Sequence, residues 1–245
     1  MAEGSVEPGK NRFLLTLDRE TLQAIEPHLE RIELGLKHYL YKPNEPIQYA
    51  YFPINGVMSM LADMGEDDPV EVATIGNEGM VGLPLFLGAN ITPGVAYSQV
   101  PGAAFQMKAD IFIDLARAHE PFRKLLHRYT QALMVQISQG NGCNRTHSIE
   151  ERCARWLLLT HDRVMADEFS LTQEFLGQML GVRRASVNIV ASTFQKAGYI
   201  EYSRGRIKIL NRAGLESASC HCYSVIRGEY DRLLNSKEVS QAEGD

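Results

Sequence analysis

The sequence predicts an α+β protein built from an antiparallel β-roll of the jelly-roll kind, a long connecting helix and a winged helix-turn-helix, in that order. Three observations predict it. From about residue 37 to 107, short alternating runs are separated by turn residues about every ten positions. From 109 to 144, apolar residues recur every three or four positions. From 171 to 212, two short helical patterns flank Gly181 and a basic hairpin pattern follows.

Length and composition set the outer limits. The chain has 245 residues, 44% of them hydrophobic, which is enough for two globular domains. No apolar run approaches the length of a membrane span, and the segment MAEGSVEPGKN lacks the apolar stretch of a secretory signal. We therefore expect a cytoplasmic protein with no membrane partner, whose four cysteines are reduced thiols. The expected ranges are 12–120 for a sensor-like roll, 121–144 for the long helix and 145–235 for the winged helix-turn-helix.

Ahead of the roll, apolar spacing predicts one helix from about Asp18 to Ile32. Within the roll, Val70, Val72 and Thr74 alternate with Glu71 and Ala73, as in a strand.

The long helix is predicted to begin near Pro121, which suits the first turn of a helix. About 22 residues would give a length of about 33 Å. No neighbouring segment is evident that would cover its whole apolar stripe, so we favour a coiled-coil homodimer over burial within the chain. Gln136 and Gly140 make the heptad imperfect. The stripe consists of Phe122, Leu125, Leu126, Tyr129, Leu133 and Ile137.

Two further helices are expected beside the helix-turn-helix. The run Ser148-Ile149-Glu150-Glu151 is a capping box that opens one of them. Its inner face carries Cys153, Trp156, Leu157 and Thr160. The other is a final amphipathic helix over roughly residues 213–234.

The spacing around Gly181 supports the helix-turn-helix. Thr172 is a suitable N-cap for a first helix that begins at Gln173, and Leu176 and Leu180 lie on its inner face. Gly177 allows a close crossing, and Gly181 tolerates the turn. In the second helix Val187 and Val190 point inward. The outward residues are then Arg183, Arg184, Ala185, Ser186, Asn188 and Ile189.

A wing follows. Tyr199, Ile200 and Tyr202 alternate with polar residues, Arg204-Gly205 makes a turn, and Ile207 and Ile209 alternate again. From 170 to 212 there are seven Lys or Arg residues against two Glu residues, a local charge of +5 in a chain whose net charge is −5. Such a basic module on an acidic chain predicts contact with the phosphates of double-stranded DNA. The alternatives are a solvated charged face, or a ligand-binding or protein-interaction module whose winged helix does not bind DNA.

This order of parts resembles the Crp/Fnr family of bacterial transcription regulators over about residues 12–234. The motifs that carry the resemblance are Tyr51-Phe52-Pro53 with Gly56, VEVATIGNEGMVG from Val70, LTQEFLGQMLGVRRASV from Leu171, GYI from Gly198 and RGRIKI from Arg204. The resemblance implies a homodimer whose recognition helices enter successive major grooves of a palindromic site. RNA polymerase is a further partner to be expected of such a regulator.

Roles in DNA reading follow from residue type. Arg184 is the candidate for a bidentate contact with guanine. Ala185 and Ile189 match family positions that often read bases, but they could touch only a thymine methyl. Ser186 and Asn188 could reach bases or phosphate. The expected phosphate contacts are Arg183, Thr172, Arg204, Arg206 and Lys208.

The roll departs from family members that bind cyclic AMP. Those members carry a Gly-Glu pair and then an Arg-Ser or Arg-Thr pair, whose Arg neutralises the cyclic phosphate. Here the acid's place falls at about Gly82 and the Arg pair's place at Thr92-Pro93, and no Lys or Arg lies between Glu71 and Gln106. We expect no cyclic-nucleotide binding of the usual kind. An unidentified small-molecule effector would have Gly82, Leu83, Thr92 and Tyr129 as candidate contacts.

No cofactor, metal or enzymatic activity is predicted. The chain has no cysteine before Cys143, which argues against the iron–sulfur centre of oxygen-sensing relatives. The histidines His38, His119 and His127 match possible haem ligands in position only. The run Cys220-His221-Cys222 could bind a metal or react with an oxidant together with Cys143 or Cys153, but a CxC pair alone lacks the spacing of a zinc site. No P-loop, GxSxG or HExxH motif is present.

Overall fold

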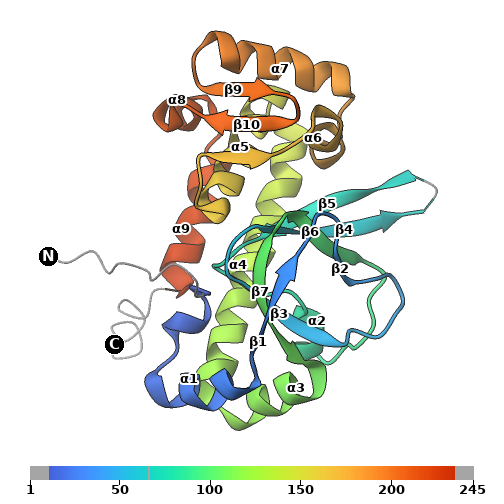
Figure 1. The fold of residues 1–245 in the computed structure, drawn as a ribbon, viewed down its shortest axis with the longest axis vertical. Helices are drawn as coiled ribbons and strands as arrows, with labels where there is room; N and C mark the ends of the chain where they lie inside the picture. Colours follow the sequence, from blue (N-terminus) through green and yellow to red (C-terminus); the bar gives the residue numbers. More distant parts are fainter. Residues whose placement is uncertain (1–10, 66, 235–245) are drawn as a thin grey trace, which may run out of the picture.

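The computed structural model describes residues 11–65 and 67–234, and its parts follow the predicted order (Figure 1). A roll of strands lies beside the lower half of a long, nearly vertical helix, α4 (Glu120–Thr146). A helical domain with a small sheet forms the top of the molecule. None of the helices in the described ranges is long and apolar enough to cross a membrane.

The roll consists of two antiparallel sheets, which confirms the predicted class. One has the order β1-β7-β3 and the other β2-β6-β4-β5. Residues such as Phe52 of β3 and Val57 and Met58 of β4 are fully buried in the core of the roll. The strands are β1 Glu30–Leu34, β2 Tyr39–Tyr41, β3 Tyr49–Pro53, β4 Val57–Met64, β5 Asp67–Ile75, β6 Val95–Val100 and β7 Gly102–Lys108, with the short helix α2 Leu83–Phe86 between β5 and β6 and helix α3 Ala109–Ala118 after β7.

The single helix predicted over Asp18–Ile32 is wrong. A 3₁₀ turn, η1 (Leu14–Thr16), precedes a short helix, α1 (Arg19–Ile25), and a second 3₁₀ turn, η2 (Glu26–His28), follows it. Pro27 lies inside η2 and has no amide hydrogen to continue the helical bonding. Ile32 instead lies in β1, where it pairs with Ala104 of β7.

Helix α4 has 27 residues, about 40 Å, and is longer than predicted. The premise that no other segment covers its apolar stripe is wrong. Phe122 packs edge-on against Phe112 of α3 (5.7 Å between centroids), and Tyr129 contacts Phe13 at 5.3 Å and Tyr230 of the last helix at 6.4 Å. Leu125, Leu126 and Leu133 are buried as well. Segments distant in sequence therefore fold back over the stripe.

A different face of α4 is exposed within the chain. Its residues are spaced four and three apart in turn, as a heptad seam is: Glu120, Lys124, His127, Gln131, Met134, Ser138, Asn141 and Arg145. Only Met134, 59% exposed, is apolar among them.

The top domain contains α5 Ile149–Val164, β8 Glu168–Ser170, α6 Gln173–Leu180, α7 Arg184–Lys196, β9 Ile200–Ser203, β10 Arg206–Ile209, α8 Arg212–Ala218 and α9 Cys222–Leu234. The capping box at Ser148 is confirmed. The single final helix is wrong, because Ser219 adopts an extended backbone and its hydroxyl donates to the carbonyl of Glu216, which competes with helix continuation.

Arg163 of α5 joins the top domain to the roll. Its buried guanidinium forms an ion pair with Glu78 (2.7 Å, Nε to Oε1) and donates to Thr74 of β5 and Gln136 of α4. A second contact runs from Trp156 Nε1 to Glu71 Oε1 at 2.9 Å. The two domains are therefore joined by specific polar contacts.

Candidate nucleic-acid interface

The helix-turn-helix has the geometry that its glycines predict. Gly181 ends α6 with φ +62°, and the amide of Val182 donates to the carbonyl of Gly177 at 2.9 Å. A Cβ on Gly177 would lie 2.9 Å from the carbonyl oxygen of Val182, closer than real Cβ atoms approach backbone. Gly177 is therefore required by the close approach of α6 to the turn, and Gly181 by its left-handed backbone.

Helix α7 separates an inward from an outward face. Val187, Val190 and Phe194 are buried against the domain core. Ile189 is 68% exposed and so is available for contact with a partner. The exposed residues at the start of α7 are Arg183, Arg184, Ala185, Asn188 and Ile189, and Ser186 is half-buried.

The wing closes with a two-residue turn. Ser203 pairs with Arg206, so that only Arg204 and Gly205 connect the strands, and both have positive φ, 51° and 75°. This is the turn geometry that matches the twist of a hairpin. Ile207 and Ile209 point into the core, whereas Arg206 and Lys208 point outward.

The wing is a three-stranded sheet, whereas the sequence pattern predicts only two of its strands. β8 pairs with β10 through Phe169 and Ile207. Its signal is weak, because a three-residue strand offers only one buried side chain, Phe169. This third strand fixes the wing to the end of α5.

The wing is also tied to α6. The amide of Leu171 donates to the carbonyl of Gly205 at 2.8 Å, and the hydroxyl of Tyr202 donates to the carbonyl of Leu171 at 2.8 Å. Burial raises the pKa of Tyr202 to about 12, so this hydroxyl remains a donor at neutral pH. Thr172 caps α6 by accepting from the amide of Phe175 at 3.1 Å. The wing turn and the start of α6 thus form one unit.

A groove of about 490 Å³ lies between the wing turn, the start of α6 and the start of α7. It is lined by Thr172, Arg184 and Arg204, three residues predicted from sequence. Gln173 and Ser203 also line it and were missed. Gln173 donates to Asn188 of α7 at 3.3 Å, a contact across the two helices that no local pattern signals.

The basic residues of the module divide into two groups. Arg206 forms an exposed ion pair with Glu168 (2.8 Å), and Arg212 forms one with Asp162 (2.7 Å). For the others the structure gives no ion pair with any residue in the described ranges: Arg183, Arg184, Lys196, Arg204 and Lys208. The cations without an ion-pair partner among the described residues are thus at the two ends of α7 and on the wing.

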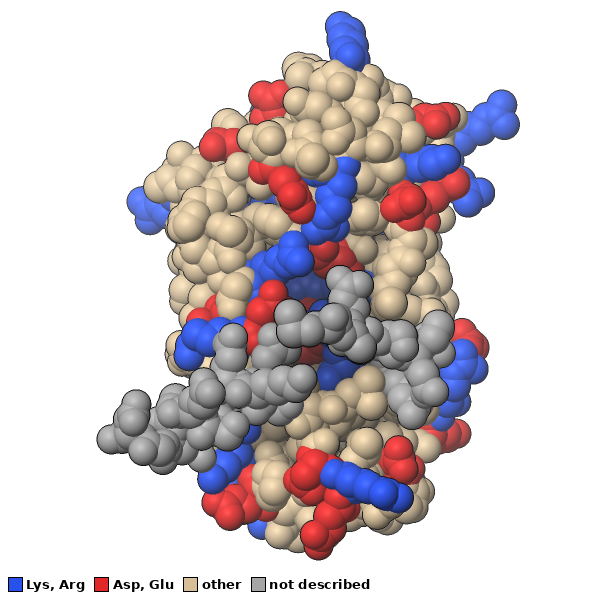
Figure 2. All heavy atoms as spheres, turned by 90° about the vertical axis from the view of Figure 1, so that its left-hand side faces the viewer, with Lys and Arg blue, Asp and Glu red and all other residues tan. Residues whose placement is uncertain are grey.

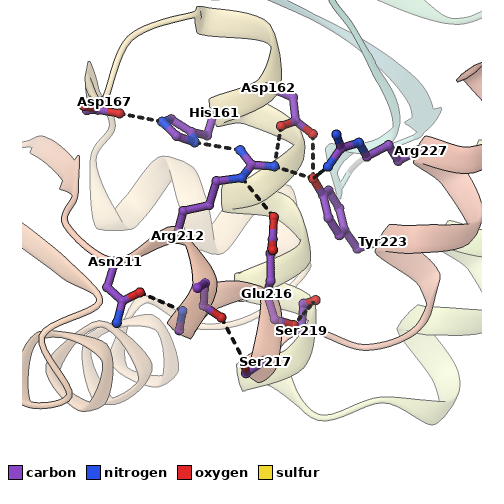
Figure 3. A network of polar contacts seen from close by, with 12 residues as sticks. His161, Asp162, Asp167, Asn211, Arg212, Glu216, Ser217, Ser219, Tyr223 and Arg227 are labelled. Atoms are coloured by element: carbon purple, nitrogen blue, oxygen red, sulfur yellow. Dashed lines mark hydrogen bonds and ion pairs between the residues drawn. The ribbon is translucent and has the colours of Figure 1, made fainter.

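Arg212 has an internal role (Figure 3). It contacts Asp162, Glu216 and Tyr223 and donates to Nδ1 of His161 at 2.9 Å. Because a guanidinium cannot accept a hydrogen bond, Nδ1 carries no proton and the Nε2–H of His161 donates to Asp167. The network joins α5, α8 and α9, so Arg212 holds the domain together rather than facing a ligand.

The face on the side of α8 and α9 carries acidic and basic side chains intermixed (Figure 2). Pairs such as Arg227 with Asp231 and Arg232 with Glu229 account for part of this pattern. A polyanion would meet no continuous field of one sign on this face.

Among the described residues, the structure gives no contact that brings the candidate effector residues together around one opening. Gly82 and Leu83 are buried at the start of α2, and Gly82 has φ 107°. The hydroxyl of Tyr129 donates to the carbonyl of Met80 at 2.8 Å. Thr92 lies in the loop before β6, where its carbonyl accepts a hydrogen bond from the amide of Asn44.

Among the candidate haem ligands, His38 and His127 are exposed and His119 is half-buried. The His127 ring packs edge-on against Phe86 at 4.8 Å.

Comparison with known proteins supports the assignment of a helix-turn-helix domain. Residues 151–218 match the family model described as the Crp-like helix-turn-helix domain. The chain is similar in fold to FixK2 from Bradyrhizobium japonicum (TM-score 0.66, 16% identity, 78% of this chain and 98% of that one). No curated protein sequence matches the chain.

Two further solved structures have the same fold. The c-di-GMP-responsive global regulator CLP from Xanthomonas campestris has a TM-score of 0.62 at 14% identity, covering 78% of this chain and 99% of that one. A transcriptional regulator of the Crp/Fnr family from Thermus thermophilus has a TM-score of 0.63 at 17% identity, covering 78% and 98%. The resemblance in architecture to Crp/Fnr regulators is therefore confirmed, and the chain carries a Crp-like helix-turn-helix domain.

Proposed function

We propose that this chain is a sequence-specific DNA-binding transcription regulator of the Crp/Fnr type that acts as a homodimer on a palindromic site. The observation that carries the proposal is the exposed start of α7 beside the wing turn. There Arg183, Arg184 and Arg204 project with no described ion-pair partner. Free guanidinium groups at a helix end and a hairpin tip suit phosphate and base contacts in a major groove.

Within this proposal Arg184 reads guanine. It occupies the first position of α7, where its planar fork can meet O6 and N7 of the base. The exposed Ile189 and Ala185 would cover a thymine methyl, which removes apolar surface from water. Asn188 and Ser186 stand beside them as polar contacts.

Phosphate contacts would come from both sides of the groove. Arg183, Thr172, Arg204 and Lys208 are exposed there. Arg206 would have to exchange its ion pair with Glu168 for a phosphate, so we expect it to contribute less than Arg204.

The homodimer would form through the exposed heptad-spaced face of α4 rather than through the apolar stripe that the chain itself buries. A twofold axis along α4 would place two α7 helices on successive half-sites about one helical turn of DNA apart. Contact with RNA polymerase and a cytoplasmic location remain predictions.

We further propose that the roll takes no cyclic nucleotide in the usual way, because the stretch between Glu71 and Gln106 has no cation to neutralise the phosphate. Gly82, Leu83, Thr92 and Tyr129 stay candidate contacts for an effector of another kind. Calorimetric titration with cyclic AMP is expected to give no saturable heat, and stoichiometric binding would contradict the proposal.

The test of DNA reading starts from a selection of random duplexes with the purified full chain. A palindromic consensus with half-sites about 10 base pairs apart is expected. Arg184→Ala should then weaken binding to the selected site by about 1–3 kcal/mol while changing binding to random duplex less. Arg184→Lys should show a similar loss of specificity, because an ammonium cannot replace the bidentate fork.

Lys196→Ala is the matched control, since it removes one exposed charge at the other end of the same helix. It should leave the selected consensus unchanged. Equal losses on selected and random duplexes in Arg184→Ala would refute base reading at this position. Failure of the wild-type chain to show salt-dependent binding to any duplex would favour a protein-interaction module.

A further inference from the structure

Four soft-ligand side chains from two distant parts of the chain converge at the top of α4. Cys143 and His147 are four residues apart at the C-terminal end of α4, where His147 is the C-cap. Cys220 lies in the link between α8 and α9, and Cys222 is the first residue of α9. One potential ligand atom from each of the four lies within 4.8 Å of every other. We propose that these four residues bind one structural zinc ion.

The distances fit a tetrahedral ion. The Cys143 and Cys220 sulfurs are 3.5 Å apart, and Cys222 Sγ is 3.5 Å from Nδ1 of His147. Zinc bonds of about 2.3 Å to sulfur and about 2.0 Å to nitrogen place tetrahedral ligand atoms roughly 3.5–3.8 Å from one another. The remaining pairs of ligand atoms lie within 4.8 Å of one another, so shifts of about 1 Å would bring them to these distances.

The composition of the cluster also points to zinc. Three cysteines with one histidine is a ligand set of closed structural zinc sites, in which the protein supplies all four ligands. The plain alternative is that the thiols pack as small apolar groups, since all three are at most 5% exposed. They form a cluster separate from the main core. Apolar packing alone does not explain why an imidazole nitrogen faces a sulfur there.

The groups around the cluster can offset the negative charge that the site would carry with zinc bound. Gln139 donates its side-chain amide to Cys222 Sγ at 3.3 Å, as outer groups around zinc thiolates do. The guanidinium groups of Arg155 and Arg152 both interact electrostatically with Cys143. The buried Nε atoms of Arg152 and Arg155 have no hydrogen-bond partner among the described residues. Three thiolates and one zinc ion carry a net charge of −1, which these cations would balance.

The sequence motif contained only half of the site. His221, between the two cysteines, is exposed and hydrogen-bonds Ser224 at 3.1 Å (Nδ1 to Oγ). Cys153, the other cysteine considered, is buried in the main core. The histidine that joins the cluster is His147, 73 positions before Cys220, and only the packing of α9 along α4 brings them together.

The site lies where the long helix meets the top domain. His147 lies directly between α4 and the cap of α5, and Cys220 and Cys222 lie directly after α8. A bound ion would fix the top domain on the long helix at this joint. Its effect on DNA reading rests on the proposed function, whereas the presence of the ion does not.

The experiment uses the full chain, purified under reducing conditions and reconstituted with Zn²⁺ or Co²⁺. Elemental analysis should find one zinc per chain, and Co²⁺ should give the ligand-field and thiolate charge-transfer absorption of a tetrahedral site. Cys143→Ala and Cys222→Ala should weaken zinc binding at least 10-fold. Cys153→Ala and His221→Ala are the matched controls and should bind as the wild type does.

His147→Cys keeps the proposal testable if the alanine variants fail to fold. It should retain one metal per chain and intensify the cobalt charge-transfer absorption, because it creates four thiolate ligands. A zinc chelator should lower the unfolding midpoint of wild type and Cys153→Ala by several degrees.

Three results would overturn the proposal. One is the absence of bound zinc by elemental analysis after reconstitution with Zn²⁺. A second is a Cys143–Cys220 disulfide in a protein that binds no metal after reduction. The third is undiminished zinc binding by Cys222→Ala. These readouts need no DNA, so a failure of the DNA-binding proposal would not be mistaken for a failure of this one.

Discussion

The buried guanidinium of Arg163 holds the top domain against the roll through its ion pair with Glu78. Burial alone would lower its pKa, but the Glu78 carboxylate raises it above the ordinary value, so the guanidinium remains charged. Arg163→Ala would leave Glu78 buried without its counter-ion, which is expected to cost about 3–5 kcal/mol of unfolding free energy. Urea unfolding checks this value.

The exposed pair of Arg232 with Glu229 provides the control, and Arg232→Ala should change stability little. The double variant Arg163→Ala with Glu78→Gln should recover part of the loss. A loss in Arg163→Ala as small as in Arg232→Ala would contradict the assigned role.

The buried carboxyl group of Glu71, which accepts a hydrogen bond from Trp156, should make the stability of the protein depend on pH. Burial raises its pKa from 4.5 to about 7, against hydrogen bonds from Ser59 and Trp156 that lower it. The folded state therefore holds this proton more tightly than the unfolded chain does. Stability from this group is full below pH 4.5, falls as pH rises from about 4.5 to 7, and is constant above that range.

Glu71→Gln should remove this dependence. Relative to wild type, the variant should gain on the order of 2 kcal/mol in unfolding free energy between pH 5 and pH 8. Denaturant unfolding across that range tests the prediction, and parallel curves for the two proteins would speak against it.

At the scale of elements, the contact between α6 and the turn before α7 depends on Gly177. A methyl group there would meet a backbone carbonyl that cannot move without opening the turn. Gly177→Ala is expected to destabilise the protein by about 1–3 kcal/mol, as overpacking does. Thermal unfolding measures it.

Gly228 of α9 is the matched control, because it is exposed and helical, and a methyl group added there would meet no described atom within 4 Å. Gly228→Ala should be neutral or stabilise by up to about 1 kcal/mol. Equal effects at the two positions would show that helix propensity, not close approach, governs Gly177.

Local patterns predicted elements well where one element's own residues decide its form. The Ser148 capping box, the Thr172 cap and the Gly181 turn depend on neighbours within four residues and were confirmed. The errors at 18–32 and 213–234 arose where Pro27 and Ser219 interrupt an apolar period that continues through them. Apolar spacing alone does not register such a break, because strand and helix can share the same few apolar positions.

At the scale of the whole molecule, the open face of α4 sets the proposed assembly. Met134 is the one large apolar residue on that heptad-spaced face. Met134→Glu should shift a dimer toward monomer, because it places like charges opposite each other at the twofold axis. Sedimentation velocity over a concentration series measures the shift.

Leu36, 61% exposed near the start of the roll, gives the control Leu36→Glu, which should leave assembly unchanged. A wild-type chain that stays monomeric at all concentrations would contradict the proposed homodimer. An unchanged dimer in Met134→Glu would move the interface to another face.

The sequence by itself determined the order of the three parts, the antiparallel roll, the helix-turn-helix and the outward residues of α7. These depend on periodicity, caps and glycines, which act within a few residues. Only the tertiary structure decided what covers α4, which cations of the basic module remain free, and which histidine joins the cysteines. The physical reason is that α9 folds back along α4 and that Arg206 and Arg212 find carboxylates on other elements. Such long-range pairings leave no local pattern in the chain.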